Sequence, residues 1–412
     1  MTIKYDNVYV LKTSTVAGKF EKEGPLKDYF DKTYKDFYMG EKTFEQGEIK
    51  MITDNVSILL SKSNKTKDDI DLFISGDLLN QITPSSYAAE RLGINYLGVY
   101  GACSTSVLGI IVASSMLQNK EINNCICNVS ANNSAAEKQY RNPTEYGTPK
   151  PPTSTFTATG CASVLLSSEK SNIKIESITI GKAIDYGIKD VYNMGAAMAP
   201  SASYTISSHL NDLKRDASYY DLIVTGDLGI YGMKILKELL LKEHHITLSD
   251  NYNDCGCMLY DINKQDVGAG ASGPTSSALV TYSYIINEMK KGIRQIRRRA
   301  GVPDYTMSEY QDRDVFRKKL KRERQIELMA EGQRYFDLRR WKDAEVEESK
   351  KNYGCNFYMS DTEEQREQFY TPIEIADLPT AFSRKLYFWP ISHDELKRNK
   401  RLTQNPGWTY ND

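Results

Sequence analysis

The sequence predicts a layered α/β body followed by a mainly helical C-terminal segment. Short apolar runs alternate with helical stretches through the first part of the chain, which is typical of a sheet covered by helices. The composition changes near Gly292, where a body rich in Ser, Ala, Gly and Asn gives way to a basic stretch from Lys290 to Arg340. Within and after that stretch, apolar residues recur at helical spacing. We therefore place a domain boundary between residues 1–291 and residues 292–412.

Seven segments of the body are predicted to be strands, because each is a short apolar run bounded by polar or turn-forming residues. They are residues 71–75, 96–100, 125–130, 162–167, 173–180, 221–225 and 257–260. Helices are predicted at residues 105–118, 229–242 and 276–291. The first of these helices is small and apolar on nearly every face, so we expect it to be buried all round. No internal tandem repeat is evident from the sequence.

Length and charge exclude several classes of protein. The 412 residues are enough for one large domain or two to three smaller ones. The net charge of −1, from 53 basic and 54 acidic residues, excludes nucleic acid as the main partner. The N-terminus has no apolar signal segment, and no apolar run approaches the ~18 residues of a membrane span. The seven cysteines are an odd number spread along the chain, which excludes a secreted disulfide framework. We therefore expect a cytoplasmic protein.

The motif VYGACSTSVLGI carries the strongest chemical signal in the sequence. Its strand ends at Tyr100 and its helix begins near Ser104, which puts Cys103 at the helix N-terminus. Unpaired backbone N–H groups and the positive end of the helix dipole stabilise a thiolate there, so Cys103 is the candidate nucleophile. A buried structural cysteine at a strand–helix junction is the alternative.

This motif occurs together with several further segments that are specific to one known family. They include SGDLLNQITPSSYAAERLGI, SANNSAAEKQYRNPTEYG and YYDLIVTGDLGIYG. In these segments and in their order, residues 1–291 resemble the stage V sporulation protein AD family. The resemblance implies a thiolase-like αβαβα layered fold, usually dimeric, in the machinery that moves dipicolinic acid into the spore and releases it at germination. It also implies a place in the cytoplasm or at the periphery of the inner spore membrane, beside the other proteins of the dipicolinate channel.

The same resemblance implies a binding protein and not an enzyme. Condensing enzymes of the thiolase class pair their cysteine with a histidine that follows a strand of the C-terminal half. Here the strand DLIVT leads to Asp227, so a carboxylate stands at that place. We expect His209, His244 and His245 to be exposed to solvent and unable to replace the missing histidine. Acyl transfer through Cys103 is kept as the enzymatic alternative.

A pyridine dicarboxylate needs helix N-termini, hydroxyl or amide donors and an apolar wall for its ring. The residues that we expect to supply a binding site are Cys103, Ser104, Asn132, Asn133, Ser134, Arg141 and Asp227. An ordinary polar turn is the alternative for residues 132–134. No cofactor or resident metal ion is expected, although calcium would offset the repulsion between Asp227 and a bound carboxylate. The expected partners are dipicolinic acid or its calcium chelate, and a second copy of the chain in a homodimer.

The C-terminal segment contains the motifs ERQIELMAEGQRYFDLRRW and QNPGW. With them, residues 293–412 resemble the C-terminal end of SusD/RagB nutrient-binding proteins of the outer membrane. We expect one long helix in which Glu323, Glu327 and Glu331 face arginines, and an aromatic core beside it, so a scaffold role is predicted. Glycan binding through Trp341 or Trp389 is the alternative.

The body departs from its family where the segment KKG ends. The family continues there with another core strand, whereas this chain continues with IRQIRRRAG, which is too basic for a buried central strand. We therefore expect a thiolase-like fold that is truncated at its C-terminal end, and a chain that is chimeric.

Overall fold

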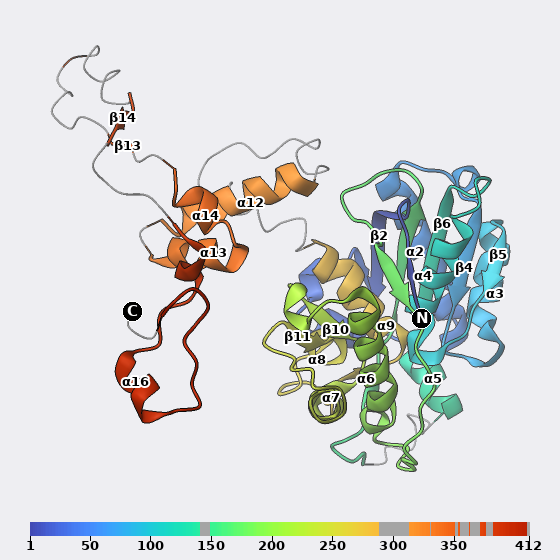
Figure 1. The fold of residues 1–412 in the computed structure, drawn as a ribbon. Helices are drawn as coiled ribbons and strands as arrows, with labels where there is room; N and C mark the ends of the chain where they lie inside the picture. The colour runs from blue at the N-terminus through green and yellow to red at the C-terminus, as the bar shows by residue number, and fades with distance from the viewer. Residues whose placement is uncertain are drawn as a thin grey trace. The chain divides into compact units, whose positions relative to one another are not determined.

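The computed structural model describes residues 1–140, 149–287, 313–329, 331–350, 353–354, 362, 371–375 and 382–409. The chain forms two compact units, residues 1–311 and 312–412, which we call unit 1 and unit 2 and describe separately (Figure 1). The predicted boundary between residues 291 and 292 lies outside the described residues and stays a prediction. Within the described part of the chain, no helix has both the length and the apolar character needed to cross a membrane.

The centre of unit 1 is a six-stranded mixed sheet. Its order is β3 (Lys32–Thr33), β2 (Tyr9–Ala17), β8 (Gly160–Ser167), β6 (Asn124–Ala131), β4 (Leu72–Gly76) and β5 (Tyr96–Gly98). Strand β8 runs antiparallel to β2 and β6, whereas β4 runs parallel to β5 and β6. Every residue of β8 is buried. Its sequence is a continuous run of small and apolar residues because a central strand is covered on both faces.

Helices cover both faces of this sheet. The helices α2 (Phe44–Ser63) and α3 (Thr83–Leu92) pack on one face. The helices α4 (Thr105–Met116) and α9 (Pro274–Leu279) pack on the other, and α9 continues as the π-helical turn η7 (Val280–Ile285).

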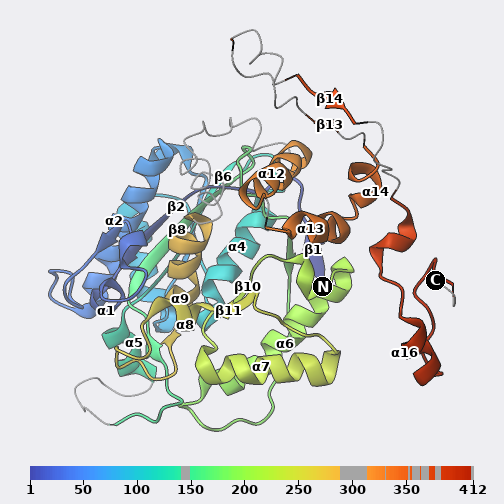
Figure 2. The ribbon, with the colours of Figure 1, turned by 90° about the vertical axis from the view of Figure 1, so that its left-hand side faces the viewer.

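The second half of unit 1 adds layers beyond α4 and α9. Its helices are α6 (Met194–Leu213), α7 (Gly229–His244) and α8 (Cys255–Leu259), and its strands β10 (Ile223–Thr225) and β11 (Tyr252–Asp254) pair in parallel. Figure 2 shows the resulting order of layers: α2, the six-stranded sheet, α4 with α9, β10 with β11, and α6 with α7. This is the αβαβα order that was predicted.

Short elements connect these layers. Strand β1 (Thr2–Lys4) pairs antiparallel with β9 (Ser177–Thr179), and β7 (Phe156–Thr157) pairs in parallel with β12 (Ala271–Ser272). The remaining elements of unit 1 are α1 (Lys19–Lys22), α5 (Asn133–Tyr140) and the 3-10 turns η1 (Lys27–Tyr29), η2 (Lys67–Asp69), η3 (Asn80–Ile82), η4 (Ala102–Ser104) and η6 (Ala217–Tyr219).

The two halves of unit 1 repeat one another at a spacing of 150 residues. The helices α2 and α6 are both 20 residues long, begin at Phe44 and Met194, and are each followed by a residue in the left-handed conformation. A 3-10 turn then leads to DLFISGDL (71–78) in the first half and to DLIVTGDL (221–228) in the second. These segments are identical at five of their eight positions. The repeat was not evident from the sequence because it survives at few positions between diverged helices.

Six of the seven predicted strands are present, several of them shorter than expected. The strand predicted at residues 257–260 is wrong, because Cys255–Leu259 form helix α8. A short apolar run does not distinguish a strand from a buried helical turn. The prediction that the helix at 105–118 is buried all round is also wrong. Gly109 and Ala113 of α4 are buried, but Val107 is 52% exposed.

Unit 2 is mainly helical in its described residues. Its helices are α12 (Arg313–Glu327), α13 (Gln333–Trp341), α14 (Ala344–Glu347) and α16 (His393–Arg398), together with the 3-10 turn η8 (Arg384–Tyr387). Strands β13 (Tyr353–Gly354) and β14 (Ile373–Glu374) pair antiparallel.

The single long helix expected in unit 2 is wrong, because the chain turns at Gly332, which adopts a φ of 72°. Two of the arginines that were expected to face glutamates, Arg324 and Arg340, both bind Asp337. The aromatic core expected from Tyr335, Phe336 and Trp341 is only partly packed, because Phe336 is 65% exposed.

Candidate functional site

Cys103 lies at a sharp turn between β5 and α4. Ala102 adopts a left-handed conformation with a φ of 47°, which is uncommon for a residue other than glycine. Local hydrogen bonds hold this turn. Ser104 donates its backbone N–H to the Gly101 carbonyl at 2.9 Å and its hydroxyl to the same carbonyl at 2.7 Å, and Thr105 Oγ1 accepts the Gly101 N–H at 3.0 Å. Cys103 is a partly buried cysteine in the turn η4, directly before α4.

Cys103 is in the wall of a pocket of about 290 Å³, which we call the Cys103 pocket. Its described walls come from the turn at Cys103, which we call the elbow, and from α5, β7 and β12. The segment after β4 and the start of α6 complete them. They include Leu78, Tyr100, Cys103, Glu137, Tyr140, Thr157, Val191, Met194 and Ser272. The described lining thus combines aliphatic side chains with hydroxyl groups.

Two tyrosines form a hydrogen-bonded pair at this pocket. The hydroxyls of Tyr100 and Tyr140 lie 3.0 Å apart, and the Tyr140 hydroxyl donates to Asn80 Oδ1 at 3.1 Å. Partial burial and the hydrogen bond with Tyr100 raise the pKa of Tyr140 above its usual value. Its hydroxyl therefore stays neutral and available as a hydrogen-bonding group at physiological pH.

Glu137 is the carboxylate of the Cys103 pocket. Its side chain is buried, its Oε1 accepts the Thr157 hydroxyl at 2.9 Å, and its Oε2 lies 3.7 Å from Lys150 Nζ. The lysine offsets part of the negative charge. The described lining of the pocket therefore includes one carboxylate, with a cation beside it.

The predicted binding residues 132–134 have structural roles. Asn132, Asn133 and Ser134 are buried where β6 leads into α5. The Asn132 amide donates to the Phe37 carbonyl at 2.8 Å, its oxygen accepts the Ser134 N–H at 3.1 Å, and the Asn133 amide donates to the Thr157 carbonyl at 3.0 Å. These side chains join three backbone segments and are not among the described residues that line the Cys103 pocket.

Asp227 is not among the described lining residues, but it binds a backbone group next to one of them. It is buried, and its Oδ2 accepts the Gly273 N–H at 3.0 Å, directly after the lining residue Ser272. Arg141 lies outside the described residues. Of the predicted binding residues that the structure describes, it places Cys103 in the pocket wall, with Ser104 next to it and its hydroxyl turned back to Gly101.

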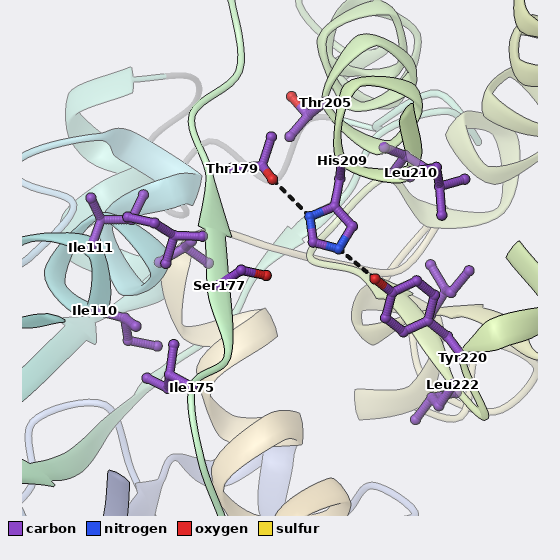
Figure 3. Close-up of a pocket in the computed structure, with 14 residues that line it drawn as sticks. Ile110, Ile111, Ile175, Ser177, Thr179, Thr205, His209, Leu210, Tyr220 and Leu222 are labelled. Atoms are coloured by element: carbon purple, nitrogen blue, oxygen red, sulfur yellow. Dashed lines mark hydrogen bonds between the residues drawn. The ribbon is translucent and has the colours of Figure 1, made fainter. Parts of the chain in front are cut away.

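The expectation that the histidines of unit 1 are exposed is wrong for His209. Its Nδ1 lies 2.7 Å from Thr179 Oγ1 and its Nε2 lies 2.7 Å from the Tyr220 hydroxyl (Figure 3). Burial and the nearby Arg215 lower the pKa of His209, so the ring is neutral at physiological pH. His209 lines a different pocket, and the described residues that line the Cys103 pocket include no imidazole.

The family model for stage V sporulation protein AD matches residues 1–300 of this chain. The chain belongs to the stage V sporulation protein AD family. The stage V sporulation protein AD of Bacillus subtilis (strain 168) is 44% identical over 285 residues, which cover 69% of this chain and 84% of that protein. The predicted family is therefore confirmed for the body, and with it a role as a sporulation protein of the AD type.

Two solved structures of OleA from Xanthomonas campestris, both with cerulenin bound, are similar to this sporulation protein in fold. Each is 14% identical to this chain, and each match covers 70% of this chain. The matches cover 90% and 92% of the OleA chains, with TM-scores of 0.48 and 0.49. The family model for the SusD family matches residues 281–408. The layers of unit 1 and the two family-model matches confirm the predicted fold class, a thiolase-like body followed by a mainly helical segment similar to SusD proteins.

Sequence reasoning identified Cys103 but missed the groups around it. Tyr100 lies in the same motif as Cys103. Glu137, Tyr140 and Ser272 are separated from the motif by tens of residues or more, and no local signal marks them. Only the packing of α5 and β12 beside the elbow brings them to the pocket.

Proposed function

We propose that this member of the stage V sporulation protein AD family binds dipicolinic acid in the Cys103 pocket and does not transform it. The protein would act at the periphery of the inner spore membrane, with the other proteins of the dipicolinate channel and as a homodimer. One observation carries the proposal: a cysteine at a helix N-terminus lies in a pocket that combines aliphatic walls with hydroxyl donors, and its described lining has no imidazole.

The dimensions and walls of the pocket support a small planar ligand. Its volume of about 290 Å³ is near the lower end of typical ligand pockets. Leu78, Val191 and Met194 offer apolar surface for a pyridine ring. The hydroxyls of Tyr100 and Tyr140 and the N-terminus of α4 offer donors for carboxylates.

The described lining of the Cys103 pocket supports binding without turnover, because it includes no imidazole and its carboxylate, Glu137, is engaged by Thr157 and Lys150. Acyl condensation at a cysteine needs a neighbouring group that accepts a proton near neutral pH and a donor that stabilises the oxyanion. His209 is engaged by Thr179 and Tyr220 at a different pocket. Asp227 is engaged by the Gly273 N–H. Neither is available to Cys103 in this arrangement.

The charge of the pocket makes a prediction about calcium. A doubly ionised ligand would lie beside Glu137, which Lys150 offsets only from 3.7 Å. We therefore expect calcium to strengthen binding by bridging the ligand and Glu137, since calcium prefers several carboxylate oxygens. Replacing Glu137 by glutamine removes the repulsion, so Glu137→Gln should bind the ligand more tightly without calcium and gain little when calcium is added.

Calorimetry of the full chain with sodium dipicolinate, with and without calcium, tests the proposal. Val191→Trp should fill the pocket and weaken binding by roughly tenfold or more, because Val191 lines it and, at 63% exposed, tolerates a larger side chain. Ile188→Trp is the matched control, since Ile188 is also exposed and is not among the described lining residues. No heat with either form of the ligand, or equal binding by both variants, would contradict the proposal.

Mass spectrometry after incubation with acyl-CoA tests the enzymatic alternative. We expect no adduct on Cys103. Cys257 is an internal control, because burial and the nearby Asp254 raise the pKa of its thiol to about 12. A stable acyl adduct on Cys103 and none on Cys257 would establish acyl transfer and refute a non-enzymatic role.

A further inference from the structure

A second pocket of unit 1, of about 450 Å³, lies between β9 and β10. We call it the strand gap. Helix α4, the segment that contains β9, helix α6 and strand β10 line it, and Val107, Ile110, Ile111, Ile178, Leu210 and Ile223 are among its residues. Figure 3 shows Ile110 and Ile111 on one side of the β9 segment, and Leu222 near Tyr220 on the other. In the part of the chain that the structure describes, the gap is therefore largely apolar and open between two strands.

The internal repeat indicates what fills the same place in the first half. Strand β2 precedes α2 and strand β4 follows it, yet β8 and β6 lie between β2 and β4 in the sheet. In the second half β9 precedes α6 and β10 follows it. Among the described residues, β9 pairs with β1 and β10 pairs with β11, and no strand lies between β9 and β10. The strand gap is the counterpart of the space that β8 and β6 occupy.

Strands β4 and β10, which correspond in the repeat, differ in burial as expected if β10 lacks a neighbouring strand. Phe73 and Ile74 of β4, which pairs with β6, are fully buried. Their counterparts in the repeat, Ile223 and Val224, are only partly buried, and Leu222 before them is 43% exposed. Nearly the same sequence is thus covered in one half and uncovered in the other.

The sequence of helix α4 indicates independently that further polypeptide covers the strand gap. Its sequence is apolar on nearly every face, which is typical of a helix packed on both sides. One side packs on the six-stranded sheet, whereas Val107, Ile110 and Ile111 line the strand gap. An exposed apolar face of this kind is costly in water and marks a surface that another chain covers.

The family match indicates where strands that could fill the gap are found. It ends at residue 300, shortly after the last described element of unit 1, and 84% of the Bacillus subtilis relative is covered. In the first half, helix α4 is followed by β6 and β8. Part of the Bacillus subtilis relative therefore lies outside the match, and this part is the candidate source of two further strands.

We propose that the strand gap binds a pair of extended apolar strands from another polypeptide, namely the C-terminal closing segment of a full-length member of the family. One strand pairs antiparallel with β9, as β8 pairs with β2, and the other pairs in parallel with β10, as β6 pairs with β4. Main-chain hydrogen bonds from the open strand edges provide affinity, and the apolar walls select strands that are rich in aliphatic side chains.

Asp221 has a defined part in this complex. In the first half, Asp71 Oδ2 accepts the N–H groups of Asn123 and Asn124, at the start of β6, at 2.7 and 2.9 Å. Asp221 is the counterpart of Asp71 in the repeat and is exposed. It accepts the backbone N–H groups at the start of the strand that pairs with β10.

Fluorescence anisotropy tests the proposal with the full chain and a labelled peptide. The peptide is the segment of the Bacillus subtilis relative that follows the counterpart of residue 300. We expect saturable binding that Val107→Asp weakens roughly tenfold or more, because a charge would be buried without a partner. Leu241→Asp is the matched control, since Leu241 on α7 is also 52% exposed and lies outside the gap. Asp221→Asn should weaken binding severalfold, and β9 and β10 should gain hydrogen-exchange protection.

Three outcomes would overturn the proposal. The first is no binding of the peptide by the unmodified chain, and the second is equal binding by Val107→Asp and Leu241→Asp with both variants folded by circular dichroism. The third is a dimer of the chain alone, seen in sedimentation, that Val107→Asp abolishes and that excludes the peptide. In that case the occupant is a second copy.

Discussion

Glu21 makes the stability of unit 1 depend on pH in a direction that can be tested. Its side chain on α1 is fully buried, and its Oε1 accepts the Thr159 N–H at 2.9 Å and the Tyr260 hydroxyl. Burial raises the pKa of Glu21 from 4.5 to about 7, although the hydrogen bonds from Tyr260 and Thr159 act in the opposite direction. Its folded-state pKa therefore lies above its unfolded-state pKa.

The sign of the effect follows from proton binding. Between about pH 4.5 and pH 7 the unfolded chain releases the Glu21 proton while the folded chain retains it. The free energy of unfolding therefore falls as the pH rises through this window. A pKa difference of this size corresponds to about 3 kcal/mol once both states are ionised.

Glu21→Gln isolates this contribution. Glutamine has the shape of the protonated acid and keeps the oxygen that accepts from Thr159 and Tyr260. Relative to the unmodified chain, the variant should gain stability as the pH rises, with a difference that is about 3 kcal/mol larger at pH 8 than at pH 4.5. Glu23→Gln, at an exposed position two residues later, should change stability little at either pH.

Urea denaturation at the two pH values measures the difference. All three tryptophans, Trp341, Trp389 and Trp408, lie in unit 2, so tryptophan fluorescence follows unit 2 and far-ultraviolet circular dichroism follows both units. The Glu21 effect should appear in the transition that the tryptophans do not report. A difference between Glu21→Gln and the unmodified chain that is the same at both pH values would refute the reasoning.

Three further predictions concern the sheet, the elbow and the domain boundary. Asn128→Ala should lower the free energy of unfolding by about 2 to 3 kcal/mol in urea denaturation, because the buried Asn128 amide hydrogen-bonds to the hydroxyls of Ser75 and Ser163. A loss below about 0.5 kcal/mol would argue against this role. Gly76→Ala should destabilise unit 1 and change the alkylation rate of Cys103. The added Cβ would lie 2.0 Å from the carbonyl oxygen of Val99, just before the elbow. An unchanged melting temperature together with an unchanged alkylation rate would contradict this prediction. Limited proteolysis with mass analysis should yield a stable fragment that begins near residue 1 and ends close to residue 292, and a chain cleaved first inside the six-stranded sheet would show the boundary to be misplaced.

The amino-acid sequence by itself determined the layered architecture and the position of the candidate nucleophile. Strand β8 is a continuous run of small and apolar residues because it is covered on both faces, and this leaves a local signal. The elbow at Cys103 is likewise encoded in one short motif, since the strand end, the turn and the helix start are neighbours in the chain.

Only the tertiary structure decided which groups surround Cys103 and which surfaces are left uncovered. Glu137, Tyr140 and Ser272 reach the pocket from distant parts of the chain, whereas the neighbouring asparagines Asn132 and Asn133 are used up in joining backbone segments. Helix α4 has a sequence suited to burial on all sides, but its burial depends on strands that would have to come from elsewhere. Local sequence sets the preference of a segment, and long-range packing decides whether that preference is met.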